Sequence, residues 1–202
     1  MKYHKFRFLL PAATIVCAGA IQTLRGEDYA FTTYAGRSQV SGGADGTPGT
    51  FNGPNGLAID ADKNLYITDT GNNTIRKITP ARVVSTLAGT AGLFGTTDGT
   101  GAAARFNFPV GVAVDAAGNV YVADAKNFTI RKITPAGAVS TYAGAPFSLG
   151  SNDGPAASAR FFLPYGVAAD TAGNVYVTDG GNHTIRKISA AGVVSTLAGA
   201  AL

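Results

Sequence analysis

Apolar residues occur along the chain in short segments, each bounded by glycine, asparagine or aspartate residues. Such segments between turn-forming residues predict β-strands joined by tight turns. Within residues 51–89 the pattern predicts four strands, at 56–60, 65–68, 74–79 and 83–88. Apolar side chains fall on both faces of these strands, as Leu65 and Tyr66 do at adjacent positions. A sheet with two apolar faces must be covered on both sides.

The predicted four-strand unit repeats along the chain. Residues 51–89, 106–144 and 161–199 align without gaps at a spacing of 55, and Ile-Arg-Lys-Ile begins at 75, 130 and 185. Four-stranded meanders repeated at a fixed period are typical of β-propeller blades, which cover one another's faces by stacking around an axis. The composition agrees, with 27 glycines and no tryptophan in 202 residues. We therefore predict an all-β fold, a propeller with three complete blades.

The repeated sequence motifs also resemble those of a known family. Pro-x-Gly-(Val/Leu)-Ala-x-Asp at 54, 109 and 164 is followed by Asn-(Leu/Val)-Tyr-(Ile/Val)-(Thr/Ala)-Asp and then by Asn-x-Thr-Ile-Arg-Lys-Ile. This combination resembles the NHL repeat, and the match extends over nearly all of residues 31–200. The resemblance implies a propeller, in which six blades are common. The links between units are long, so the period exceeds the roughly 40–45 residues of a typical propeller repeat.

Residues 31–36 repeat the sequence motif of the fourth strand, but no motifs of the first three strands precede them. They therefore predict an orphan outer strand. Three blades are also fewer than the roughly four to eight of a closed propeller. We expect either further blades beyond residue 202, which we favour, or association of copies to close the ring.

The N-terminus has the pattern of an export signal. Lys2, Lys5 and Arg7 precede an apolar stretch at residues 8–20 that ends in Ala-Gly-Ala. This pattern predicts a signal peptide over residues 1–20, with a later cut, up to residue 26, as the alternative. The stretch is too short to span a bilayer, so we expect a secreted or periplasmic propeller segment over 27–202 with no membrane span. A lipoprotein signal at Cys17 is the rival interpretation, with a poor match around the cysteine.

Removal of the signal peptide brings the net charge of the chain close to zero. Three of the 16 basic residues leave with it, so 13 Lys and Arg remain against 12 Asp and Glu. Nucleic acid is therefore not an expected partner, because binding to phosphate backbones needs clustered basic residues. The remaining chain has no cysteine and a single histidine, His183, so we predict no disulfide, no cofactor and no metal site within one chain.

Two local motifs resemble ligand sites. Residues 99–104 fit the glycine pattern of dinucleotide binding, but no strand leads into them, and we favour a short helical turn capped by Asp98 or Asp153. Residues 60–64 resemble the start of a calcium loop, but Leu65 stands where glycine is needed. A hairpin turn is the favoured interpretation.

One aspartate and one arginine recur at the same place in every unit. Because catalysis seldom needs one residue type in every blade, we interpret them as structural pairs and predict no catalytic residue. The repeated positions are Asp69, Asp124 and Asp179 with Arg76, Arg131 and Arg186.

Residues that differ between units are the candidates for binding. In an up-and-down blade, the connection between the second and third strands and the link to the next blade emerge on the same side. The unit-specific residues expected there are Asn73, Phe128, His183, Leu93, Phe94, Phe147 and Leu149. We therefore expect a binding or interaction scaffold for a protein, peptide or glycan.

The alternative is a metal-assisted lyase or lactonase whose site is completed by blades outside this chain. Enzymes of similar architecture use histidines or a glutamate with metal ions, but the chain after the signal has one histidine and one glutamate, Glu27, which lies outside the repeats. RNA binding, known for some NHL proteins, is disfavoured by the export signal and the charge.

Overall fold

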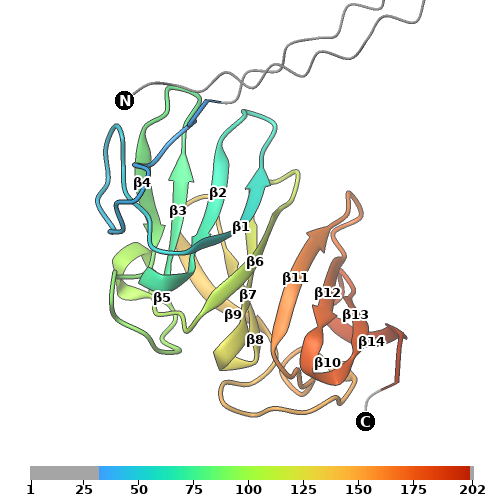
Figure 1. Ribbon diagram of the computed structural model, residues 1–202. Helices are drawn as coiled ribbons and strands as arrows, with labels where there is room; N and C mark the ends of the chain where they lie inside the picture. Colours follow the sequence, from blue (N-terminus) through green and yellow to red (C-terminus); the bar gives the residue numbers. More distant parts are fainter. Residues whose placement is uncertain (1–31, 201–202) are drawn as a thin grey trace, which may run out of the picture. The chain divides into compact units, whose positions relative to one another are not determined.

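The computed structural model describes residues 32–200, in which three antiparallel sheets follow one another along the chain (Figure 1). The first sheet has the order β1 (Pro54–Ile59), β2 (Leu65–Asp69), β3 (Thr74–Ile78), β4 (Val84–Ala88). The second has the order β5 (Gly99–Thr100), β9 (Ala138–Ala143), β8 (Thr129–Ile133), β7 (Val120–Asp124), β6 (Pro109–Val114). The third has the order β10 (Gly154–Pro155), β14 (Val193–Ala198), β13 (Thr184–Ile188), β12 (Val175–Asp179), β11 (Pro164–Ala169). The predicted four-stranded blades of a propeller are confirmed.

The hairpin between the first two strands of each blade is closed by an aspartate. Asp60 accepts hydrogen bonds from the N–H of Asn64 at 2.8 Å, from its side-chain amide at 2.8 Å and from the hydroxyl of Tyr66 at 3.0 Å. Burial acts to raise the pKa of Asp60, but these hydrogen bonds outweigh it and lower the pKa. The same contacts recur at Asp115 and Asp170. These residues therefore form a hairpin turn, as the spacing predicts.

Short 3-10 helices connect the second and third strands. They are η1 (Thr70–Asn72), η3 (Ala125–Asn127) and η4 (Gly180–Asn182), and a fourth, η2 (Gly101–Ala103), lies in the link between the first two blades. No helix among residues 32–200 is long and apolar enough to cross a membrane.

Neighbouring blades pack face to face through one apolar cluster at each junction. At the first junction, Tyr66 and Ile75 of the first blade lie in one cluster with Phe106, Val112 and Val122 of the second. The second junction repeats this arrangement with residues of the second and third blades. Each sheet, apolar on both faces, is therefore covered at these junctions by the sheet of a neighbouring blade.

The innermost strands approach most closely at a glycine. An added Cβ at Gly56 would collide with the carbonyl oxygen of Val110, and one at Gly111 would collide with that of Tyr165. In each case the colliding backbone belongs to the next blade. Glycine is required at both positions because the backbone of the next blade occupies the space that a side chain would need.

The segment that precedes each blade pairs with the outer edge of that blade. β5 pairs with β9, and β10 pairs with β14. In the first blade, Gly46 takes this place, and its N–H and C=O both bond to Val84, at 2.9 and 3.0 Å.

The outer strand predicted at residues 31–36 is not formed over residues 32–36, which carry no strand pairing. Gly46 already occupies the outer edge of β4, so this segment runs as irregular backbone. Its Ala35 packs beside Ile67, Ile78 and Val84 on the first blade. The predicted signal over residues 1–20 lies outside the described residues.

Candidate functional site

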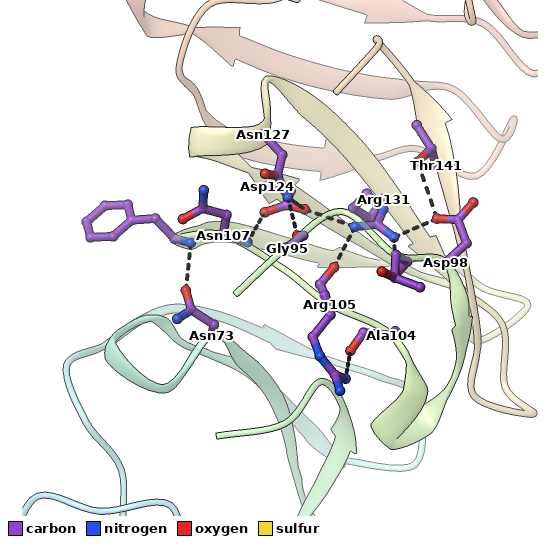
Figure 2. Close-up of polar contacts among 12 residues, drawn as sticks. Asn73, Gly95, Asp98, Ala104, Arg105, Asn107, Asp124, Asn127, Arg131 and Thr141 are labelled. Atoms are coloured by element: carbon purple, nitrogen blue, oxygen red, sulfur yellow. Dashed lines mark hydrogen bonds and ion pairs between the residues drawn. The ribbon is translucent and has the colours of Figure 1, made fainter. Parts of the chain in front are cut away.

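Each blade contains a buried ion pair between the aspartate that ends its second strand and the arginine of its third. In the second blade, Asp124 Oδ2 lies 3.0 Å from Arg131 Nη1, and both side chains are buried (Figure 2). The carboxylate also accepts hydrogen bonds from the side chain of Asn127 at 2.8 Å and from the N–H of Asn107 at 2.7 Å. The equivalent pairs are Asp69 with Arg76 at 2.8 Å and Asp179 with Arg186 at 2.9 Å.

The arginine also joins its blade to the segment that precedes it. Arg131 Nη2 lies 2.6 Å from Asp98 Oδ1, and the guanidinium donates to two backbone carbonyls of the same segment. Its central carbon lies 5.2 Å from the centre of the Phe106 ring. The corresponding outer carboxylates in the other blades are Asp45 and Asp153. We call each such group of one arginine and two aspartates an arginine clamp.

The role predicted for Asp98 and Asp153 is wrong. A short turn does form as η2, but its N-cap is Thr100 and no side chain caps it. Asp98 accepts hydrogen bonds from Arg131 and from Thr141, and Asp153 accepts them from the equivalent residues of the third blade. A buried guanidinium needs acceptors for its N–H groups, and this demand outweighs a helix cap.

The electrostatics of the buried carboxylate fit a structural role. Burial raises the pKa of Asp124 to about 6, although Asn107, Arg131 and Asn127 all favour the charged form. The side chain has no exposed surface. A substrate in solvent cannot reach this carboxylate, so the repeated aspartates are not candidates for catalysis or ligand contact.

The unit-specific residues after the 3-10 turns share an unusual backbone. Asn73, Phe128 and His183 have φ values of 55°, 60° and 57°, in the left-handed region. Two of them contact the next blade. Asn73 Oδ1 accepts a hydrogen bond from the N–H of Phe108 at 2.8 Å, and the Phe128 ring packs edge-on against Phe162 with centroids 5.9 Å apart. Asn73 and Phe128 are half-buried at blade junctions, whereas His183 is exposed.

The loops that leave the fourth strands hold the other unit-specific residues. The N–H of Gly92 donates to the carbonyl of Asn72, and that of Phe147 donates to the carbonyl of Asn127, both at 3.2 Å. Each loop is thereby attached to the connection between the second and third strands of its own blade, as the topology predicts. The apolar side chains on these loops are all exposed: Leu93, Phe94, Phe147 and Leu149. We call residues 91–94 and 146–149 the apolar loops.

A hollow that the sequence does not reveal lies between the β1–β2 and β6–β7 hairpins. Its volume is about 330 Å³, and its lining includes Asp60, Asp62, Lys77 and Asp115. The carboxylates of Asp60 and Asp115 are already bonded within their own hairpins. The hollow exists only because two neighbouring blades set their hairpins side by side, and no spacing along one blade predicts it.

A metal centre of the kind used by lactonases does not fit these residues. Within residues 32–200, no three His, Cys, Asp or Glu side chains gather where they could hold a metal ion.

Repeated antiparallel blades that stack through apolar junctions define the chain as a β-propeller protein. The family model of the SMP-30/gluconolactonase/LRE-like region matches residues 37–152, more than half of the chain, and the NHL repeat model matches residues 163–188. The chain belongs to the SMP-30/gluconolactonase/LRE-like family.

The similar proteins are longer than this chain. Protein SUPPRESSOR OF QUENCHING 1, chloroplastic, of Arabidopsis thaliana is 32% identical over an alignment of 154 residues that covers 70% of this chain and 14% of that protein. A protein of unknown function from Bacteroides thetaiotaomicron is 32% identical with a TM-score of 0.63, over 74% of this chain and 37% of the other. An auxiliary nutrient binding protein from Bacteroides ovatus is 26% identical with a TM-score of 0.54, over 67% of this chain and 35% of the other. The chain thus spans less than half the length of each.

Proposed function

We propose that this chain is an extracytoplasmic NHL-repeat propeller segment that binds a protein, peptide or glycan through its apolar loops. The charged N-terminal residues and the apolar stretch at 8–20 support export. The aromatic side chains on the apolar loops support a binding surface, since aromatic residues are enriched where proteins bind partners.

The exposure and the backbone conformation of Phe147 are the main support for the proposal. Its side chain is 65% exposed, and its φ of 58° is a conformation that bulky residues rarely adopt. The equivalent residue of the first blade is Gly92, with a φ of 79°. Glycine at position 147 would therefore allow the same backbone with less strain. The presence of phenylalanine there is explained better by binding than by folding. Phe94, 71% exposed on the preceding apolar loop, extends the same kind of surface.

The binding class is also supported by a relative. The Bacteroides ovatus protein that is 26% identical to this chain is an auxiliary nutrient binding protein. Its name supports a binding role for this chain.

A lactonase is the second candidate, favoured by the family model over residues 37–152. Its metal-holding residues would have to come from outside residues 32–200, since no suitable cluster lies within them. Hydrolysis of a sugar lactone by the full chain would support this candidate.

The binding proposal is tested with the full chain on a glycan microarray and against a displayed library of random peptides. For any ligand found, Phe147→Gly is expected to weaken binding by more than about tenfold, because it removes an exposed anchor and leaves an allowed backbone. Val83→Ala is the matched control, since Val83 is exposed before β4 and outside the apolar loops. Unchanged binding by both Phe147→Gly and Phe94→Ala would contradict the proposal.

A further inference from the structure

The hollow between the β1–β2 and β6–β7 hairpins has a filled counterpart at the next blade junction. At the second junction the equivalent of Leu87 is Tyr142, whose ring packs edge-on against Tyr121 with centroids 5.1 Å apart. At the first junction Leu87 lines the hollow together with Tyr66, the equivalent of Tyr121. Leucine is shorter than tyrosine and carries no ring. The hollow therefore lies in the place that the Tyr142 ring takes at the second junction.

The lysine that lines the hollow has one aromatic neighbour where its counterpart has two. Lys132 Nζ lies 5.7 Å from the centre of the Tyr121 ring and 5.9 Å from that of Tyr142. Its equivalent Lys77 lies 5.6 Å from the centre of the Tyr66 ring and has no second ring beside it in the described part of the chain. A ring placed in the hollow as Tyr142 is placed at the second junction would contact both Tyr66, edge-on, and the Lys77 ammonium. Both kinds of contact are favourable.

A second departure from the repeat lies at the same hollow. Asp62 lines it, whereas the equivalent residues of the other blades are Ala117 and Ala172. Burial and the neighbouring Asp60 and Asp62 raise the pKa of Tyr66 to about 12, so the charge of Asp62 reaches the hydroxyl of that tyrosine. Asp62 forms no ion pair with another of the described residues. The fold of the other blades does without a carboxylate at this position, which leaves Asp62 available to an ammonium group.

The net charge around the hollow favours a cation. Asp60 and Asp115 also line it, each bonded to an asparagine and a tyrosine of its own hairpin. Burial acts to raise the pKa of both carboxyls, but these hydrogen bonds outweigh it and lower the pKa, so both are charged at neutral pH. With Asp62 they set three carboxylates against the single ammonium of Lys77. The rest of the lining includes apolar side chains such as Val120, which suit a hydrocarbon ring.

We infer that the hollow binds a small aromatic amine, a phenol-sized ring on a short chain that ends in a primary ammonium group. The ring takes the place that the Tyr142 ring has at the second junction, against Tyr66 and Lys77, and the ammonium group pairs with Asp62. The volume of about 330 Å³ lies within the roughly 300–1,000 Å³ of small-molecule sites. In an antiparallel blade the β1–β2 hairpin and the β2–β3 connection lie at opposite ends. The hollow is therefore at the end away from the apolar loops, and the inference does not depend on the proposed function.

The test is isothermal titration calorimetry of the full chain with tyramine, a phenol ring on an ethylamine chain. We expect saturable binding at one site per chain. Leu87→Tyr places in the hollow the side chain that the second junction already holds, and it is expected to weaken binding by more than about tenfold. Leu197→Tyr is the matched control, because it makes the same change at the same position of the third blade, outside the lining of the hollow, and should leave binding unchanged. Far-UV circular dichroism of each variant verifies the fold.

Asp62→Ala tests the ammonium contact separately from the ring. It gives the first blade the alanine of the other two, so the fold is expected to be kept. The variant should bind tyramine more than about tenfold more weakly and should bind p-cresol, which has the ring without the amine, as the wild type does. The wild type should bind p-cresol more weakly than tyramine. The inference is overturned by an absence of saturable tyramine binding, by equal affinity for the two probes, by unchanged tyramine binding in Leu87→Tyr or Asp62→Ala, or by lost binding in Leu197→Tyr.

Discussion

Removal of Arg131 is the sharpest test of the arginine clamp. Arg131→Met keeps an unbranched apolar side chain but leaves Asp124 buried without its cation. Loss of one partner of a buried ion pair costs about 3–5 kcal/mol. Asp98→Ala removes the outer partner, whose side chain is 52% exposed, and exposed pairs contribute only about 0–1 kcal/mol. The free energy of unfolding should therefore fall much further for Arg131→Met.

The measurement is urea unfolding followed by far-UV circular dichroism, which suits a chain without tryptophan. Since repeats can unfold separately, hydrogen exchange of peptides from β7 and β8 shows whether the loss is local to the second blade. Asp124→Asn combined with Arg131→Met should recover part of the loss, with a coupling of about 0.5–3 kcal/mol. If Arg131→Met costs no more than Asp98→Ala, the reasoning about the buried pair is refuted.

Two further outcomes concern the fold. Between about pH 4 and 6, the unfolding free energy of the wild type should fall with rising pH relative to Asp124→Asn, because the folded chain holds the Asp124 proton with a pKa of about 6 against the ordinary 3.8. Urea titrations at several pH values check this, and a difference that does not vary with pH contradicts it. Gly111→Ala should cost about 1–3 kcal/mol or more, since its Cβ meets the Tyr165 carbonyl, and a fully tolerated alanine in the same urea assay would show that the inner strands are not closely packed.

The blades could be predicted from the sequence because their four main strands recur three times at one spacing, whereas the short edge strands β5 and β10 were not predicted. The aspartate–arginine pair could be inferred for the same reason. The outer carboxylate of the clamp was missed because the first copy breaks the spacing. Asp98 and Asp153 are 55 residues apart, but Asp45 precedes Asp98 by only 53. The recurrent Asp-Gly before each unit was the available signal.

The surroundings of the unit-specific residues could not be predicted in the same way. Asn73 and Phe128 share a slot with His183, yet two of them contact the next blade and the third is exposed. What lies beside such a side chain depends on how one blade stacks against another, which no pattern within one repeat encodes. The apolar loops could be placed because chain connectivity alone assigns the end of the blade from which they emerge.

The arginine clamp also decides where the chain can be cut without damage to a blade. Arg131 binds Asp98, and Arg186 binds Asp153, so each blade depends on a carboxylate that lies before its first strand. A truncated chain that began between Asp98 and β6 would keep Arg131 without its outer carboxylate and the second sheet without its edge strand β5. A truncated chain that began ahead of Asp98 would keep both. The structural unit is therefore offset from the visible repeat and begins at the Asp-Gly dipeptide.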